Sequence, residues 1–185
     1  QGLIPKGGRR LVSQCGIFEY EGRFIMITDA AINIAPDVET QIGIVENALP
    51  VARALGVECP KVAVLSAVEN VTDKMPSTVT AREIAERGVE GCVISGPLAL
   101  DGAISMESVK HKAIKDPVAG QADILLVPFI EIGNVLYKAC SYIAGKTMAS
   151  TICGASCPVI ITSRADTPDS KYYSILMAVL RCLKA

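Results

Sequence analysis

The residues best suited to chemistry stand at the ends of strand-like apolar segments. The clearest case is Ser163-Arg164, which follows the apolar run 159–162 and comes just before a predicted helix. A guanidinium beside a hydroxyl and a helix N-terminus suits a phosphate or another dianion, because all three supply hydrogen bonds or positive charge. A surface arginine paired with Asp166 or Asp169 at the start of that helix fits the same residues equally well.

Other strand ends and turns carry further candidates for substrate binding. In open α/β sheets, ligands bind beyond the carboxyl ends of the strands, where loops meet helix N-termini. Tight turns and helix caps need the same residue types without any ligand, so a purely structural role stays open for them. The candidates are Thr28, Asp29, Gly96, Pro97, Gly120 and Asn134.

Composition excludes several classes of function. Half of the 185 residues are hydrophobic and 20% are charged, which favours a globular domain over a disordered chain. The 18 basic and 19 acidic residues give a net charge of −1, so nothing indicates binding to nucleic acid or to a membrane surface. No apolar run approaches the length of a membrane span.

The cysteines predict a reduced protein of the cytoplasm. There are seven, an odd number, and they are scattered among apolar neighbours. No second close cysteine pair accompanies Cys153 and Cys157, and His111 is the only histidine, so the sequence does not favour a structural zinc site. We predict no bound metal.

Three features that could indicate nucleotide binding or catalysis do not support either function in this sequence. The dinucleotide fingerprint GxGxxG is absent. Gly145-Lys146-Thr147 resembles the end of a phosphate-binding loop, but Cys140 stands where that loop needs glycine, and the segment follows a predicted helix. His111 lies between two lysines, which is typical of a solvated helix face.

The elements that must position these residues alternate between strand and helix. This pattern predicts an α/β protein with a largely parallel sheet, in one continuous succession without a linker. The first two strands should form a hairpin through Glu21-Gly22, and the fourth should stop at Gly96-Pro97. Predicted strands are 10–18, 23–28, 61–66, 91–95, 123–128, 148–153 and 158–162; predicted helices are 36–56, 77–88 (from a Ser/Thr cap), 131–144 and 168–183.

Several sequence segments, in the same order and over nearly the whole chain, resemble the phosphate acetyl/butyryltransferase family. Their residues are most similar to the butyryl branch of that family. Many matching strings in register are more specific than any single motif. The strings are ITDAAINIAPD (27–37), KVAVLSAVE (61–69), GPLALD (96–101), PVAG (117–120), GNVLYK (133–138) and TSRAD (162–166).

The resemblance implies reversible transfer of a short acyl group between coenzyme A and phosphate, converting butyryl-CoA and phosphate to butyryl phosphate and CoA. Acyl-CoA, phosphate and acyl phosphate would be the ligands, with coenzyme A as a substrate and no cofactor. It also implies a homodimer or higher homo-oligomer. The alternative is an inactive CoA-binding or dimerisation fragment.

The resemblance further implies a three-layer fold like that of isocitrate and isopropylmalate dehydrogenases, with two α/β domains and a mostly parallel sheet. Residues 15–154 would form the second domain, and residues 1–14 and 155–185 would be remnants of the first. The family's N-terminal segment, which supplies most of the first domain, has no counterpart here. Because the chain begins with Gln1 rather than Met, we expect a piece of a longer enzyme.

The resemblance also implies roles for individual residues. Arg164 would hold the phosphate, and Ser163 would hydrogen-bond the reacting carbonyl or thiol. An aspartate downstream, which takes the thiol proton in the acetyl branch, falls on Ser170 by an ungapped count. Asp166 and Asp169 are therefore the candidates for the base.

The substrate-binding set implied by the resemblance adds Lys138 and Ser170 to the strand-end candidates above. One departure from the family lies at Ser95, where many members of the butyryl branch have an aspartate before the Gly-Pro turn.

Overall fold

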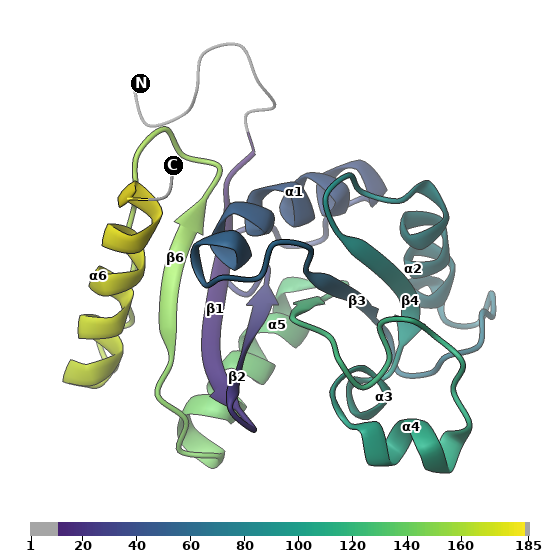
Figure 1. Cartoon of the computed structure of the whole chain (residues 1–185). Coiled ribbons are helices and arrows are strands. Elements are labelled where there is room, and N and C mark those ends of the chain that lie inside the picture. The colour runs from purple at the N-terminus through teal and green to yellow at the C-terminus, as the bar shows by residue number, and fades with distance from the viewer. Residues whose placement is uncertain (1–10, 184–185) are drawn as a thin grey trace.

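A computed structural model describes residues 11–183 as a mixed six-stranded sheet with helices on both faces (Figure 1). The predicted α/β class is therefore confirmed. The strands are β1 (Ser13–Tyr20), β2 (Arg23–Thr28), β3 (Lys61–Leu65), β4 (Val93–Leu98), β5 (Ile124–Leu126) and β6 (Ala149–Cys153). The helices are α1 (Val38–Ala54), α2 (Pro76–Arg87), α3 (Leu100–Ile104), α4 (Met106–Lys112), α5 (Ile130–Lys138), the π-helical η1 (Ala139–Ile143) and α6 (Pro168–Leu183).

The strand order is β4-β3-β5-β2-β1-β6. The first four of these strands are mutually parallel, whereas β1 is antiparallel to both β2 and β6. Because β6 therefore runs in the direction of β2, the sheet is mixed but largely parallel, as predicted, and β1 is its one reversed strand. The reversal comes from the predicted hairpin, which is confirmed. Glu21 and Gly22 both have positive φ, the turn geometry that matches the twist of a two-residue hairpin.

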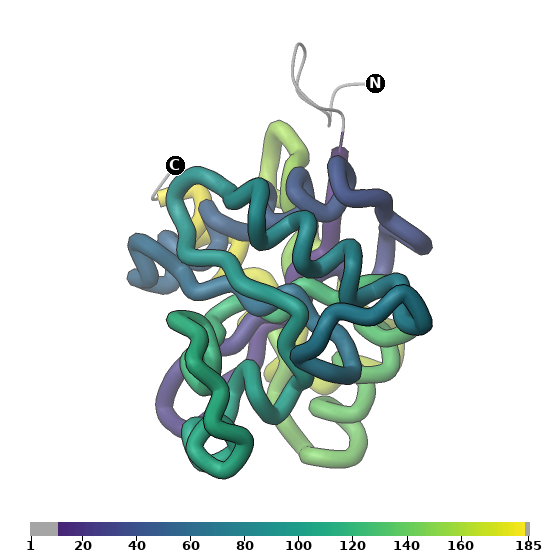
Figure 2. The backbone as a smooth tube through the Cα atoms, turned by 90° about the vertical axis from the view of Figure 1, so that its right-hand side faces the viewer, coloured from purple at the N-terminus to yellow at the C-terminus, as the bar shows by residue number. Residues whose placement is uncertain are grey.

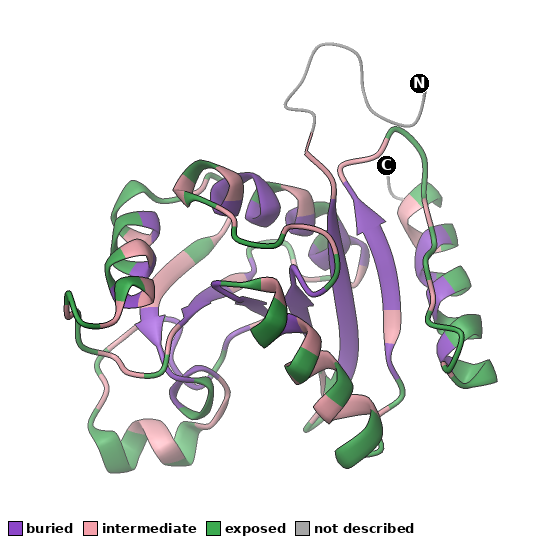
Figure 3. Cartoon of the chain, turned by 180° about the vertical axis from the view of Figure 1, so that it is seen from behind, coloured by how far each residue is buried: buried purple, intermediate pink, exposed green. Residues whose placement is uncertain are grey.

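Each face of the sheet has its own apolar core, because successive side chains of a strand point to opposite sides. Along β2, Met26 joins the core under α1 and α2, while Ile25 and Ile27 join the core that α3 and α5 cover. Figure 1 shows α1 in front of the strands and α5 behind them. Seen from behind, the strands are largely buried and the outer sides of the helices are exposed (Figure 3).

The fourth strand does not stop at Gly96-Pro97 as predicted but runs through both residues to Leu98. Two features make this possible. Because β4 is an edge strand with an irregular register against β3, a missing proline N–H is tolerated there. Gly96 also lies so close to β3 that an added Cβ would come 2.9 Å from the Val64 carbonyl oxygen. Figure 2 looks onto this edge of the molecule.

The predicted strand 158–162 was wrong, since only one isolated bridge joins Val159 to Ile152. The outer edge of β6 is already occupied by α6. The Met148 and Ser150 amides donate to the hydroxyls of Ser170 and Ser174, at 3.3 and 2.9 Å. A continuous strand cannot pair with amides that are already used.

The predicted helices differ from the structure in detail. Helix 131–144 divides into α5 and the π-helical turn η1, and α2 starts at Pro76 rather than at a Ser/Thr cap. The short helices α3 and α4 were not predicted. His111 is exposed on α4, as its lysine neighbours indicated, and all seven cysteines are free.

Residues 11–183 show neither a membrane-spanning helix nor a cluster of metal-binding side chains. No helix there has the length and apolar character needed to cross a membrane. No group of three or more His, Cys, Asp or Glu side chains in the same range could hold a metal ion.

Candidate active site

The turn 163–166 presents Arg164 at the protein surface. Asp166 closes the turn, because its Oδ2 accepts the Ser163 amide at 2.7 Å and its own amide donates to the Ser163 carbonyl at 3.1 Å. Arg164 is exposed and has no hydrogen bond or ion pair with any residue between 11 and 183. The structure therefore does not show the surface ion pair that was the alternative role of Arg164, and the guanidinium is free to meet an anion.

Ser163 is exposed beside Arg164, and its hydroxyl is oriented by the same turn. Its Oγ accepts the Ala165 amide at 3.3 Å, which leaves the hydroxyl proton available for another acceptor. The turn therefore offers one cation and one hydroxyl donor side by side, which is a suitable pair for a phosphate or a developing oxyanion.

The residues after the turn begin α6. Thr167 caps the helix, since its Oγ1 accepts the Ser170 amide at 3.2 Å. Asp169 is exposed in the first turn, where the helix dipole favours a carboxylate. Ser170 is only 4% exposed, and its hydroxyl is used by Met148 and Thr167. The position matched to the family's base therefore holds a hydroxyl that fastens α6 to β6.

At the end of β2 and in the loop after it, the polar side chains of Thr28 and Asp29 already form hydrogen bonds within the protein. Asp29 is 2% exposed, and its carboxylate accepts three backbone amides, from residues 31 to 33, at 2.9 to 3.1 Å, and the Asn33 side chain. Thr28 is buried and donates to the Gln14 carbonyl at 3.0 Å. These two candidates fix the loop and do not present free groups to a ligand.

Helix α5 lies directly against that loop. A Cβ on Gly133 would come 2.6 Å from the Asp29 carbonyl oxygen, so only glycine permits this approach. The Asn134 amide group donates to the Ala30 carbonyl at 3.2 Å, while Lys138 is exposed at the end of the helix. Asn134 thus positions the helix, and Lys138 is its free cation.

Tyr137 packs α5 against β1. Its ring lies on Gly16 of β1, where an added Cβ would come 2.5 Å from the Tyr137 Cδ2 atom. Burial, followed by the negative charge of Asp166, raises the pKa of Tyr137 to about 12. Tyr137 was not among the candidates predicted from the sequence, although it lies one helical turn after Asn134 in the string 133–138.

The remaining candidates, Gly96, Pro97 and Gly120, are not brought to the turn that carries Arg164. Gly96 and Pro97 lie in β4, and five strand spacings of about 4.8 Å place that strand roughly 24 Å from β6. Gly120 has φ of +74° and packs against Met106. Near them, the Ser95 hydroxyl donates to Asp116, whose other oxygen accepts the amides of residues 118 and 119. These contacts organise the loop before β5.

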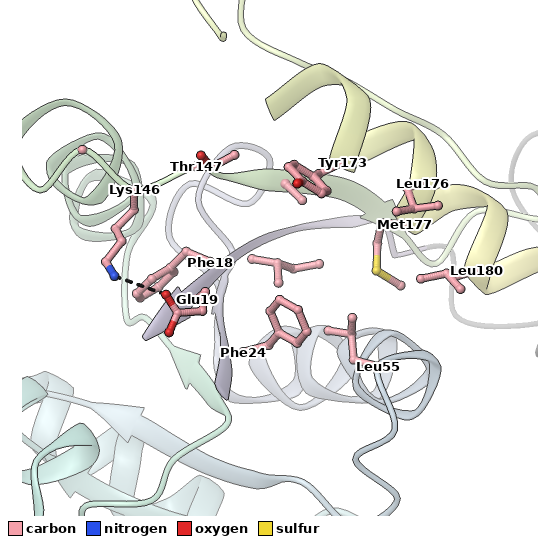
Figure 4. A pocket seen from close by; sticks show the side chains of 13 residues that line it. Phe18, Glu19, Phe24, Leu55, Lys146, Thr147, Tyr173, Leu176, Met177 and Leu180 are labelled. Carbon is pink, nitrogen blue, oxygen red and sulfur yellow. Dashed lines mark ion pairs between the residues drawn. The ribbon is translucent and has the colours of Figure 1, made fainter. Parts of the chain in front are cut away.

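Two hollows adjoin α6 and α5, the helices that carry some of the candidate residues, although no candidate side chain lines either one. One, of about 490 Å³, separates α6 from the β1–β2 hairpin and is lined mainly by apolar side chains such as Phe24, Leu176 and Leu180 (Figure 4). The Lys146–Glu19 ion pair, at 3.5 Å, crosses its rim. The other, of about 550 Å³, lies beyond the carboxyl ends of β3 and β5 against α5.

The chain is similar to known acyltransferases. A family model described as "Phosphate acetyl/butaryl transferase" matches residues 2–179. A Bacillus subtilis protein named "Probable phosphate butyryltransferase" is 48% identical over 85% of this chain and 54% of its own length. Phosphate butyryltransferase of Clostridium acetobutylicum is 44% identical over 92% of this chain and 59% of its own.

A solved structure agrees with these sequence matches. The branched-chain phosphotransacylase of Enterococcus faecalis V583 superimposes with a TM-score of 0.89 at 42% identity, over 97% of this chain and 65% of that one. The chain thus spans between half and two thirds of the length of these relatives. It belongs to the phosphate acetyl/butyryl transferase family.

Proposed function

We propose that the protein containing this chain transfers a short acyl group, such as butyryl, between coenzyme A and phosphate. The observation that carries the proposal is the exposed Arg164, which has no partner among residues 11–183 and lies beside the Ser163 hydroxyl in a chain of this family. A free guanidinium held at the start of a helix is suited to phosphate, which it can contact through two N–H donors.

The transfer step uses the two side chains in different ways. Arg164 holds the phosphate while one phosphate oxygen attacks the thioester carbonyl carbon. The new C–O bond forms, the C–S bond breaks, and the electron pair leaves on sulfur, which then takes a proton. The Ser163 hydroxyl donates a hydrogen bond to the carbonyl oxygen as negative charge develops there, which lowers the barrier.

In the reverse direction the CoA thiol must lose a proton before it attacks the acyl phosphate. Free thiols have pKa values of about 8.5, so a nearby carboxylate increases the reactive fraction. We assign this role to Asp169, because it is exposed and lies two residues after Thr167 in the first turn of α6, whereas Asp166 holds the Ser163 amide. Asp166 remains the second candidate, and a D166N variant compared with D169N separates the two.

Among the proposed substrate-binding residues, Lys138 is the one with a free charge, and we place it near the anionic part of CoA. Thr28, Asp29, Gly96, Pro97, Gly120, Asn134 and Ser170 would shape the loops and helix ends around the substrates. Their internal contacts support this indirect role.

We propose the wider organisation from family membership. Residues 15–154 would be one domain of a fold like that of isocitrate and isopropylmalate dehydrogenases, and residues 1–14 and 155–185 would belong to the other. The strands run from residue 13 to residue 153, which agrees with the first of these ranges to within two residues, and α6 of the second part packs against β6. Acyl-CoA and phosphate would be the substrates of a cytoplasmic homo-oligomer.

The test is a CoA-release assay on the product of the complete reading frame that contains this chain. With butyryl-CoA and phosphate, Arg164→Ala should lower kcat/KM for phosphate by about 100-fold or more, and Arg164→Lys should retain part of it. The thermal midpoint should not move. Arg82→Ala, on the exposed face of α2, is the matched control.

The absence of CoA release from both butyryl-CoA and acetyl-CoA would overturn the proposal. In that case, retained binding of CoA, measured by calorimetry, would favour the alternative of an inactive CoA-binding unit.

A further inference from the structure

The hollow beyond the carboxyl ends of β3 and β5 has no role in the transfer step described above. Its volume is about 550 Å³, within the roughly 300–1,000 Å³ typical of small-molecule sites. Large apolar side chains that stay exposed around one cavity indicate a binding site rather than ordinary surface. The hollow has four of them, Leu100, Phe129, Ile132 and Val135, with exposed fractions of 38, 44, 46 and 67%.

The topology of the sheet places this hollow where open α/β sheets bind ligands. Strands β3 and β5 are parallel neighbours. The chain leaves β3 toward α2 on one face of the sheet, and it leaves β5 toward α5 on the other face. A crevice opens between two adjacent strands whose connections diverge in this way, and ligands of α/β proteins bind in that crevice.

Helix α5 adds two opposite charges beside the hollow. Glu131 lines the hollow in the first turn of the helix, and Lys138 is exposed in the last turn. Neither side chain forms a hydrogen bond or an ion pair with another residue between 11 and 183. Seven residues make two helical turns, so the two charges lie on one side of α5, roughly 10 Å apart along its axis. Val135 lies between them on that side.

This arrangement suits a flat apolar ring that carries an amino group and is joined to phosphates. Adenine can stack on the Phe129 ring and contact the apolar wall of the hollow. The Glu131 carboxylate can accept a hydrogen bond from the exocyclic amino group. The same carboxylate repels phosphates and offsets the helix dipole at this end, so the phosphates fit the opposite end, near Lys138.

We propose that this hollow binds the adenine ring of coenzyme A, with Glu131 on its amino group and Lys138 near its phosphates. The proposal rests on the proposed function and deepens it. The acyl chain is a less suitable occupant, because β5 lies three strand spacings, roughly 14 Å, from β6. Ile161, just before the Arg164 turn, is bonded to β6. A butyryl group is too short to span this distance, whereas CoA carries its adenine at the end opposite the thiol.

The test measures the binding of CoA and of its two halves by calorimetry, on the product of the complete reading frame. The halves are adenosine 3′,5′-bisphosphate and 4′-phosphopantetheine. Phe129→Ala removes the stacking surface, so the affinities for CoA and for adenosine bisphosphate should fall by about tenfold or more. The affinity for phosphopantetheine should not change. Phe24→Ala, on an exposed phenylalanine of the other hollow, should change none of the three affinities.

Glu131 should set a preference for adenine over other purines. Inosine 3′,5′-bisphosphate has a carbonyl oxygen in place of the amino group, so the wild type should bind it about tenfold more weakly. Glu131→Ala should abolish this preference, whereas Glu107→Ala, in the first turn of α4, should retain it. Val135→Asp alters the hollow at a side chain that is 67% exposed, outside the core, and should weaken CoA binding as Phe129→Ala does.

The outcomes separate the adenine site from the proposed function. Weaker binding of phosphopantetheine in Phe129→Ala, with adenosine bisphosphate unchanged, would place the acyl arm in the hollow and overturn the proposal. Unchanged CoA binding in both Phe129→Ala and Val135→Asp would overturn it as well. Loss of ATP binding alone would assign the hollow to a free nucleotide instead. A protein that releases no CoA, yet binds it through Phe129, would overturn the proposed function and support the adenine site.

Discussion

The loop 29–33 and the turn 163–166 both hold an aspartate that accepts backbone amides, yet they differ in almost every other respect. Asp29 is buried and accepts three amides and a side chain. Asp166 lies near the surface, and its carboxylate accepts the single Ser163 amide beside the free Arg164. Hydrogen bonds therefore fix the loop 29–33, whereas the turn 163–166 presents a free charge at the surface.

This contrast distinguishes a structural polar residue from a functional one. A buried carboxylate whose oxygens are all occupied has nothing left for a ligand, and removing it strands several donors. An exposed cation without a partner contributes little to stability and remains available for binding. Substitutions in the two segments should therefore have opposite effects on stability and on activity.

The largest effect is expected at Asp29. Asp29→Ala leaves three amide donors without their acceptor in a half-buried loop, so the free energy of unfolding should fall by about 2–4 kcal/mol. Urea denaturation measures this loss. Asp29→Asn keeps one acceptor and should lose less, and the exposed Asp73→Ala should stay within about 0.5 kcal/mol of wild type. Equal losses for Asp29→Ala and Asp73→Ala would contradict the comparison.

The next effect concerns the close approach of α5 to that loop. Gly133→Ala would place a Cβ 2.6 Å from the Asp29 carbonyl oxygen, and backbone cannot move aside cheaply. We expect a loss of about 1–3 kcal/mol of stability despite the better helix propensity of alanine. Val135→Ala, on the exposed side of the same helix, is the control. A stabilised Gly133→Ala protein would show that the contact can relax.

A smaller effect should appear at alkaline pH and involves Tyr137. Its pKa is raised to about 12 in the folded protein, against about 10 in an unfolded chain. The folded state therefore holds the proton more tightly, so this stability is complete below pH 10 and is lost as pH rises toward 12.

Denaturation at pH 9, 10 and 11 checks this dependence. Wild type should lose stability faster than Tyr137→Phe above pH 10, by no more than about tenfold in the unfolding constant per pH unit. Parallel pH profiles of the two proteins would show that Tyr137 titrates normally.

The smallest stability effect is expected at Asp166. Asp166→Ala removes one hydrogen bond from an accessible turn, so the unfolding free energy should change by less than about 1 kcal/mol. The same variant should lower acyltransfer more than it lowers stability, because the turn places Arg164. A large shift in the urea midpoint would mean that the two segments are alike after all.

Much of the fold could be predicted because hydrophobic periodicity and turn residues act locally. Glu21-Gly22 specified the hairpin, and most buried strands were placed within a few residues of their bounds. The strand at 158–162 could not be excluded locally, since serines of α6, a dozen residues later, take the amides it would need. Helices α3 and α4 are too short for periodicity to reveal.

The candidate site was only partly predictable, because local sequence patterns do not reveal which contacts its side chains make in the folded chain. The residue types of Ser163-Arg164 indicated an anion site, but whether Arg164 has a partner depends on how Asp166 is used in the folded chain. Tyr137 was missed because an aromatic residue at helical spacing usually indicates core packing. Its ring meets Gly16 only when the folded chain brings β1 beside α5.

The attachment of α6 to β6 also limits how the sheet can grow. The outward amides at 148, 150 and 152 are taken by Ser170, Ser174 and the Val159 carbonyl. An incoming strand would find no free donors along this border and would first have to displace a helix. The serines of α6 thus protect one side of the sheet against strand addition, a common first step of aggregation.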